Sequence, residues 1–94
     1  MDANIPYKKA KTSSDAYSSI KAAITPAYIE KFKVAAKINY DEKKKTITAE
    51  GTGFTLEIFF TDIEVQLNLK LSLLLRPIKG KVIETLEREI KKHV

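Results

Sequence analysis

The feature that most constrains the fold is the alternation of side chains over residues 63–73. Glu, Gln, Asn, Lys and Ser occupy every second position of this segment, and the positions between them are apolar: Ile63, Val65, Leu67, Leu69, Leu71 and Leu73. A period of two is typical of a β-strand that has one buried face and one solvated face. The chain is therefore expected to build a sheet that is covered on one side.

Three shorter segments with a period close to two precede this strand, over residues 34–40, 46–50 and 54–60. Polar or glycine-containing turns separate them, including Gly51-Thr52-Gly53, where glycine tolerates the backbone angles of a tight reversal. Loops this short join neighbouring antiparallel strands. The sequence therefore predicts a four-stranded antiparallel meander.

A helical period flanks the strands on both sides. Before them, apolar side chains recur every three or four residues at Tyr17, Ile20, Ile24, Tyr28 and Phe32. Thr25-Pro26 interrupts this run, because proline breaks a helix but also starts one well. We expect either a kinked helix over 14–33 or two short helices that meet at Thr25. After the strands, residues 77–92 form a second amphipathic segment.

These elements predict an α+β domain of the order α-β-β-β-β-α, with the N-terminal and C-terminal helices packed on one face of the sheet. A chain of 94 residues suffices for one core. Residues 1–12 have few apolar side chains, three lysines and a proline. We therefore expect a flexible basic arm over 1–12 and a single domain over 13–94.

The composition excludes several classes of site. The chain has no cysteine and a single histidine, His93, near its end. Disulfide scaffolds, thiolate metal sites and cysteine nucleophiles are therefore excluded, and the single terminal histidine disfavours a histidine metal cluster or a Ser-His-Asp triad. We expect no catalytic residue, metal or cofactor, and no enzymatic activity. No apolar run reaches the length of a signal peptide or a membrane-spanning helix, so the expected location is the cytoplasm.

The net charge of +5 is unevenly distributed along the chain. Residues 1–45 hold ten lysines and five acidic residues, whereas residues 46–94 are balanced. Most of the excess falls in two clusters, the first formed by Lys8, Lys9 and Lys11 and the second by Lys43, Lys44 and Lys45. These lysines are candidate contacts for a nucleic acid or an anionic surface, and the alternative reading is a solvated arm and turn.

The start of the C-terminal helix offers a second candidate site. Lys79, Gly80 and Lys81 follow Pro77, and a helix N-terminus with nearby lysines can bind an anion. The alternative is purely structural: Pro77 starts the helix, and Gly80 lets it lie close to the sheet.

Two apolar side chains are predicted to face away from the core. Phe59 and Leu74 lie out of phase with the apolar positions of their segments. Together they could form a patch on the outer side of the sheet, suited to a homodimer or to a hydrophobic surface. The alternative is that Ile5 and Tyr7 of the N-terminal arm cover them.

The segment Leu74-Leu75-Arg76-Pro77-Ile78-Lys79-Gly80, at the passage from the last strand into the last helix, resembles the polyhydroxyalkanoic acid system proteins, also called the polyhydroxyalkanoate granule-region family. The likeness extends weakly over residues 13–92, and Ile78 stands where an aromatic residue is common. The resemblance implies a small, non-enzymatic α+β protein without a cofactor. It also implies a binding or accessory role at polyester storage granules, on the polymer surface or on granule-associated proteins.

Two other functions are consistent with the sequence. The first is a basic nucleic-acid-binding module that uses the two lysine clusters. The second is a small carrier of an apolar ligand, held between a curved sheet and the C-terminal helix. A carrier requires a cavity of several hundred Å³, so the cavity volume tests this hypothesis.

Overall fold

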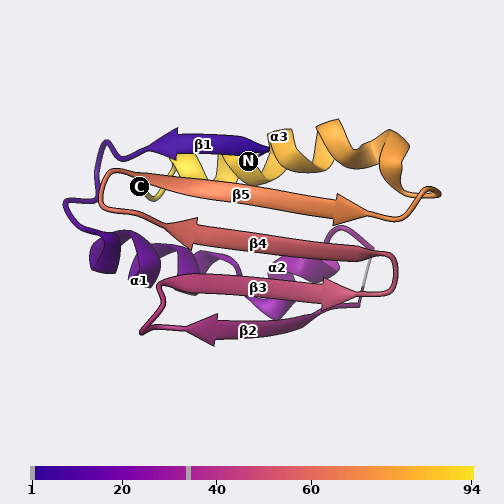
Figure 1. The fold of residues 1–94 in the computed structure, drawn as a ribbon, viewed down its shortest axis with the longest axis horizontal. Helices are drawn as coiled ribbons and strands as arrows, with labels where there is room; N and C mark the ends of the chain where they lie inside the picture. Colours follow the sequence, from indigo (N-terminus) through magenta and orange to yellow (C-terminus); the bar gives the residue numbers. More distant parts are fainter. Residues whose placement is uncertain (1, 34) are drawn as a thin grey trace.

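The computed structural model describes residues 2–33 and 35–94, and it shows an α+β fold built on an open antiparallel sheet (Figure 1). The strand order is β1-β5-β4-β3-β2, so five strands form the sheet and the expectation of four is corrected. The strands are β1 (Ala3–Pro6), β2 (Lys37–Asp41), β3 (Thr46–Gly51), β4 (Phe54–Phe60) and β5 (Glu64–Leu71). Val34, which the alternation places at the start of β2, lies outside the described residues.

The additional strand, β1, comes from the segment that was expected to be a flexible arm. It pairs antiparallel with β5, with Ala3 opposite Leu67 and Ile5 opposite Val65. Ala3 and Ile5 are buried in the core, and Asn4 and Pro6 point to the exposed side. Proline is tolerated here because β1 is an edge strand. The prediction of a flexible arm is therefore wrong for residues 3–6.

Of the two alternatives for the N-terminal half, the structure shows two short helices that meet at Thr25, not one kinked helix. The helix α1 (Ser13–Ala23) is capped by Thr12, whose hydroxyl accepts a hydrogen bond from the Asp15 backbone N–H at 3.1 Å. The helix α2 (Pro26–Glu30) is capped in the same way by Thr25, with Pro26 in its first turn. A threonine cap followed by proline is a strong helix start, which explains the split.

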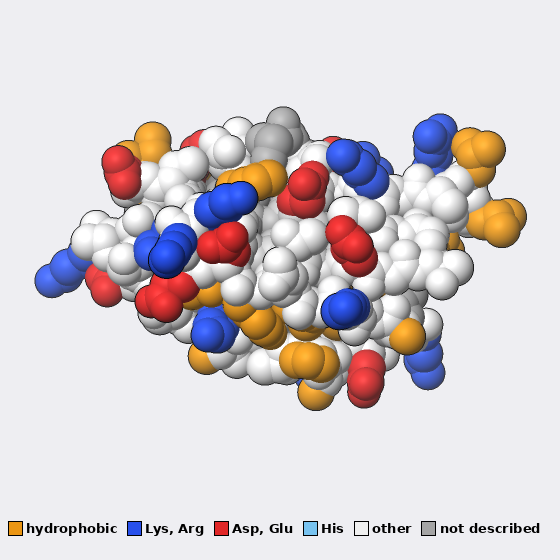
Figure 2. All heavy atoms as spheres, turned by 60° about the horizontal axis from the view of Figure 1, so that its bottom comes forward, with side chains coloured by type: hydrophobic (Ala, Val, Ile, Leu, Met, Phe, Trp, Pro, Cys, Tyr) orange, Lys and Arg blue, Asp and Glu red, His pale blue; other side chains and the backbone are white. Residues whose placement is uncertain are grey.

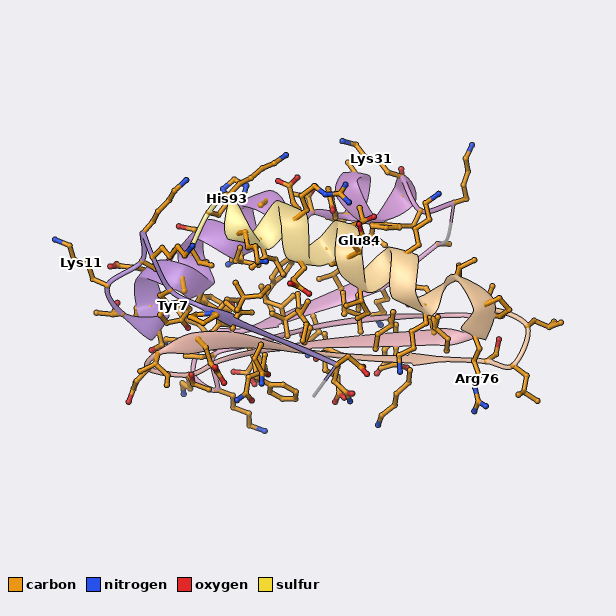
Figure 3. The ribbon with its side chains drawn as sticks, turned by 90° about the horizontal axis from the view of Figure 1, so that it is seen from above. Tyr7, Lys11, Lys31, Arg76, Glu84 and His93 are labelled. Atoms are coloured by element: carbon orange, nitrogen blue, oxygen red, sulfur yellow. The ribbon has the colours of Figure 1, made fainter. Side chains whose placement is uncertain are left out.

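The C-terminal helix α3 (Lys79–Lys91) follows a 3₁₀ turn over Arg76–Ile78. All three α-helices lie on the same side of the sheet, and the opposite face of the sheet is not covered by another layer (Figure 3). The helix α3 packs against β1 and β5, whereas α1 packs against β4. The uncovered face carries the polar positions of each strand.

The core lies between this helical layer and the inner face of the sheet. Its fully buried large side chains are Ile5, Ile20, Ile24, Ile47, Ile58, Leu67, Leu86, Ile90, Val65 and Val94. Tyr17 and Phe60 add an edge-to-face aromatic contact with ring centres 5.6 Å apart. Ile63 and Leu73, expected on the buried face, are instead 71% and 75% exposed, because they lie beyond both ends of β5.

The molecule is elongated, with extents of 38 × 21 × 20 Å. The chain terminus closes one end of it. The carbonyl oxygen of Val94 accepts backbone hydrogen bonds from Lys8, Lys9 and Ala10, at 2.6, 2.6 and 3.0 Å. We call this the terminal end. The turn that leads from β5 into α3 forms the other end, on the right of Figure 1.

Candidate functional site

The most unusual surface feature of the molecule lies at the turn after β5. Leu73 is 75% exposed, Leu74 is 91% exposed and Ile78 is 46% exposed. We call these three side chains the apolar tip. Figure 2 shows hydrophobic side chains protruding at the same right-hand end of the molecule. Single exposed apolar residues are ordinary, but a cluster of large ones on one turn indicates an interaction site.

Local hydrogen bonds fix the turn that presents the apolar tip. The Ser72 backbone N–H donates to the Gly53 carbonyl at 2.8 Å, and the Leu75 and Arg76 N–H groups both donate to the Ser72 carbonyl at 3.0 Å. Gly53 has a φ of 83°, which an L-residue adopts only with strain. The β3–β4 hairpin therefore anchors the turn, and the leucines project from a defined backbone.

A small apolar pocket lies behind the tip, between α2, α3 and the sheet. Its walls are entirely apolar: Ile29, Phe32, Phe54, Leu56, Leu69, Leu71, Leu75, Ile78, Val82 and Leu86. Its volume is about 50 Å³. Pockets for small-molecule ligands typically measure about 300–1,000 Å³, so this one has room for part of one side chain only.

A basic hollow adjoins the tip at the β5 side. Its volume is about 310 Å³. Its lining consists of three cationic side chains, Lys70, Arg76 and Lys79, and of Asn68, Leu69 and Leu71. Arg76 points away from the helical layer in Figure 3 and makes no ion pair with any described residue. Three cationic side chains therefore line one hollow, and two of them, Lys70 and Arg76, lie within three residues of the exposed leucines in the sequence.

One carboxylate reaches the basic hollow. Asp2 forms an ion pair with Lys79 at 3.1 Å and accepts a hydrogen bond from the Leu69 backbone N–H at 2.6 Å. That backbone hydrogen bond, with the help of Lys79 and against partial desolvation, lowers the pKa of the Asp2 carboxyl. The second carboxylate nearby, Glu57, is 4.0 Å from Lys70. The hollow therefore retains an excess of positive charge.

The residues predicted to contact an anion are separated in the structure. Lys79 lines the basic hollow, whereas Gly80 and Lys81 lie on the exposed surface of α3 and do not line it. A Cβ atom built on Gly80 would meet no atom within 4 Å. The alternative reading, in which Gly80 allows close packing on the sheet, is therefore wrong.

The structure does not bring Phe59 and Leu74 together. Phe59 faces the outer side of β4, opposite Thr46 and Gln66. Leu74 lies beyond Leu71, which pairs with Phe54 at the other end of β4. Phe59 lies five positions after Phe54 along β4, which corresponds to about 17 Å.

The N-terminal arm covers neither Phe59 nor Leu74. Ile5 is buried in the core, on the other face of the sheet from Phe59. The Tyr7 hydroxyl donates to the Thr61 carbonyl at 2.7 Å, and burial raises the pKa of Tyr7 to about 12. Tyr7 therefore remains neutral and acts as a structural hydrogen-bond donor.

The two lysine clusters lie at the terminal end, far from the tip. Lys8, Lys9 and Lys11 precede α1, and Lys43, Lys44 and Lys45 form the β2–β3 turn. Some of these lysines have contacts within the chain: the Lys9 Nζ donates to the Lys92 carbonyl at 2.8 Å, and the Lys45 Nζ lies 5.7 Å from the Tyr17 ring centre. Acidic side chains are interspersed with the lysines in Figure 2. The charge of this end is therefore mixed.

Within the described residues, no cluster of three or more His, Asp or Glu side chains is arranged to hold a metal ion. His93 contacts Glu89 at 3.0 Å, and this hydrogen bond lowers the pKa of the Glu89 carboxyl. None of the helices in the same ranges combines the length and apolar character that a membrane crossing requires.

Comparisons with known proteins give no match: no family model fits the chain, and neither the curated proteins nor the solved structures contain a similar one. The site must therefore be interpreted from its own residues. Sequence reasoning missed the basic hollow, although Lys70 and Arg76 flank the leucines in the sequence. The sequence shows two of these cations close to the leucines, but it does not show that Lys79 and Asp2 join them.

Proposed function

We propose that the chain is a non-enzymatic cytoplasmic binding protein that docks on a hydrophobic surface through its apolar tip. The observation that carries this proposal is the exposure of Leu73 and Leu74 on a turn that the Gly53 and Ser72 carbonyls hold in place. Burial of one leucine side chain contributes about 1.5–3 kcal/mol. Two leucines suffice for a reversible contact, since a millimolar Kd corresponds to about 4 kcal/mol.

The pocket geometry favours surface docking over carriage of a ligand. A cavity of about 50 Å³ is smaller than the range in which small molecules are enclosed. The carrier hypothesis would require the helices to move away from the sheet. Docking requires no such rearrangement, because the leucines already face the solvent.

The charge distribution also favours surface docking over nucleic-acid binding. A nucleic-acid module typically combines a basic stripe with exposed aromatic side chains or a recognition helix. Here the two lysine clusters are mixed with acidic residues, and the apolar groups at the tip are aliphatic.

The sequence resemblance suggests which hydrophobic surface is bound. The segment similar to the polyhydroxyalkanoic acid system proteins, residues 74–80, contributes Leu74 and Ile78 to the tip. The proposed target is therefore the polyester surface of a storage granule or a protein bound to it. The alternative hypothesis is that the same leucines bind a second copy of the chain.

Co-sedimentation with polyhydroxybutyrate particles tests the proposal. We expect Leu73→Ser/Leu74→Ser to weaken particle binding at least tenfold, since two apolar anchors are lost. The matched control is Ile63→Ser, which removes a side chain of similar exposure, 71%, at the opposite end of β5. Equal binding of the wild type and the double variant would refute the proposal.

Gel filtration distinguishes surface docking from self-association. The proposal expects a monomer at the concentrations at which the protein binds particles. A dimer that Leu74→Ser dissociates, with no particle binding by the wild type, would assign the tip to a second copy of the chain.

A further inference from the structure

We infer that the surface recognised by the apolar tip carries anionic headgroups, and that the basic hollow receives the phosphate of a phospholipid while the leucines enter the acyl layer. This inference rests on the proposed docking through the apolar tip, and it assigns a layer of anionic phospholipid, in place of bare polyester, as the surface that the tip contacts. It is carried by the adjacency of two independent features, the exposed leucines and the converging cations Lys70, Arg76 and Lys79.

The basic hollow retains positive charge that would attract a phosphate. Lys79 is compensated by Asp2 at 3.1 Å. Lys70 has only Glu57 at 4.0 Å, and its own side chain is 71% exposed, so this contact is weak. Arg76 has no ion-pair partner among the described residues. A phosphate would therefore find one free guanidinium and one loosely held ammonium, and arginine binds phosphate oxygens with two parallel hydrogen bonds.

Two of these cations flank the exposed leucines in the sequence, as expected of a segment that binds a lipid layer. In sequence, Lys70 lies three residues before Leu73 and Arg76 lies two residues after Leu74. Peripheral proteins bind lipid layers with apolar side chains below the headgroups and Lys or Arg at headgroup level. Leu73 and Leu74, which are 75% and 91% exposed, stand between these two cations in the sequence, so the turn carries both kinds of side chain.

The helix α3 has its N-terminus at the same end of the molecule as the tip. This helix begins beside the tip, has no side-chain cap, and has no acidic residue in its first turn. Its N-terminus therefore adds positive potential at the same end of the molecule.

The open shape of the hollow favours a lipid over a free anion. Lys70 and Lys79 are 71% and 40% exposed, so water screens both ammonium groups. A free phosphate would lose part of its hydration for weak contacts. When the phosphate belongs to a lipid, the free energy of burying Leu73 and Leu74 in the acyl layer adds to these weak contacts.

Vesicle co-sedimentation tests the inference with the full chain. We expect vesicles of equal parts phosphatidylcholine and phosphatidylglycerol to bind the protein at least tenfold more tightly than vesicles of phosphatidylcholine alone. Lys70→Gln/Arg76→Gln should weaken binding to the mixed vesicles about 30-fold, since each basic residue near an anionic surface contributes about fivefold. Raised sodium chloride should reduce the preference for anionic vesicles.

The matched control is Lys11→Gln/Lys43→Gln, which changes two exposed lysines at the terminal end and reduces the net charge by the same amount, from +5 to +3. This control should bind the mixed vesicles within threefold of the wild type. An equal loss in both double variants would show that net charge alone drives binding and would overturn the inference, as would equal affinity for the two kinds of vesicle.

The remaining outcomes separate this inference from the proposed function. Binding to polyester particles without a preference for anionic vesicles would overturn the inference and leave the proposed function standing. Absence of binding to particles and to both vesicles would overturn the two together. At equal ionic strength, sodium phosphate should release the protein no better than sodium chloride, and selective release by phosphate would assign the hollow to a free anion instead of a lipid.

Discussion

The two ends of the molecule use similar residue types in opposite ways. At the terminal end, lysines and acidic residues are mixed, and the buried Val94 joins the C-terminus to the segment after β1. At the tip, leucines are exposed, and the nearby cations exceed the nearby carboxylates. The comparison teaches that the number of lysines does not identify a binding surface. The tip is distinguished by apolar groups that no described residue covers, together with cations that the described carboxylates neutralise only in part.

The largest effect on stability should come from the terminal end. Val94 is 1% exposed, so Val94→Ala leaves a cavity in the core and should lower the free energy of unfolding by about 2 kcal/mol. Leu74→Ser should change it by less than about 0.5 kcal/mol, because the side chain is already in water. Urea unfolding of both variants measures the difference. A similar loss in both would show that the tip is part of the folded core.

The next effect concerns how firmly the tip is held. Gly53→Ala places a Cβ at a φ of 83° and within 3.1 Å of the Ser72 Oγ and 3.2 Å of the Leu75 Cδ1. We expect a loss of about 1 kcal/mol in the free energy of unfolding. Binding to polyester particles should also weaken, because the strain acts on the turn that presents the leucines. Unchanged stability and binding would contradict the anchored turn.

A stabilising change is expected at Gly80. The residue is the second of α3, has no positive φ, and leaves open space where a Cβ would lie. Gly80→Ala should therefore raise the free energy of unfolding by up to about 0.8 kcal/mol, the helix-propensity difference of a helix interior. Thermal unfolding is the measurement. A destabilised variant would show that Gly80 is constrained by a contact that the structure does not contain.

The smallest effect is the pH dependence that Asp2 adds near the tip. Its folded-state pKa is below the ordinary value of 3.8, so the ionised carboxylate stabilises the fold above that pH. This contribution is lost as the pH falls through the folded-state pKa. Asp2→Asn should therefore be less stable than the wild type near neutral pH, and the gap should close in acid. A pH-independent gap in denaturant unfolding would contradict the ionic role of Asp2.

The sequence predicted the α+β class and most of the strands because alternation is a local signal. The prediction of where each strand ends was wrong where the pairing with a neighbouring strand determines those ends. The strand β5 was expected to extend over Ile63 and Leu73, but β4 pairs only from Phe54 opposite Leu71 to Phe60 opposite Val65. Without a partner on β4, the ends of the alternating segment leave the sheet. The exposed leucine at position 73 is the direct result.

The strand β1 and the basic hollow were not predictable for a related reason. Four residues are too few to show a periodicity, and β1 is recognised only by its pairing with β5. The contact between Asp2 and Lys79 joins opposite ends of the chain, so spacing in the sequence does not indicate it. The lysine clusters, in contrast, were conspicuous in the sequence, and the structure places them at the terminal end, away from the tip.

The elongated shape of the molecule determines how it would occupy a surface. Its tip lies at one end of the 38 Å axis, and the two shorter extents are 21 and 20 Å. A copy attached by its leucines would stand upright, with a footprint set by its two short dimensions. Neighbouring copies attached in this way would pack along their long sides, and each would hold its two lysine clusters at the far side of that layer.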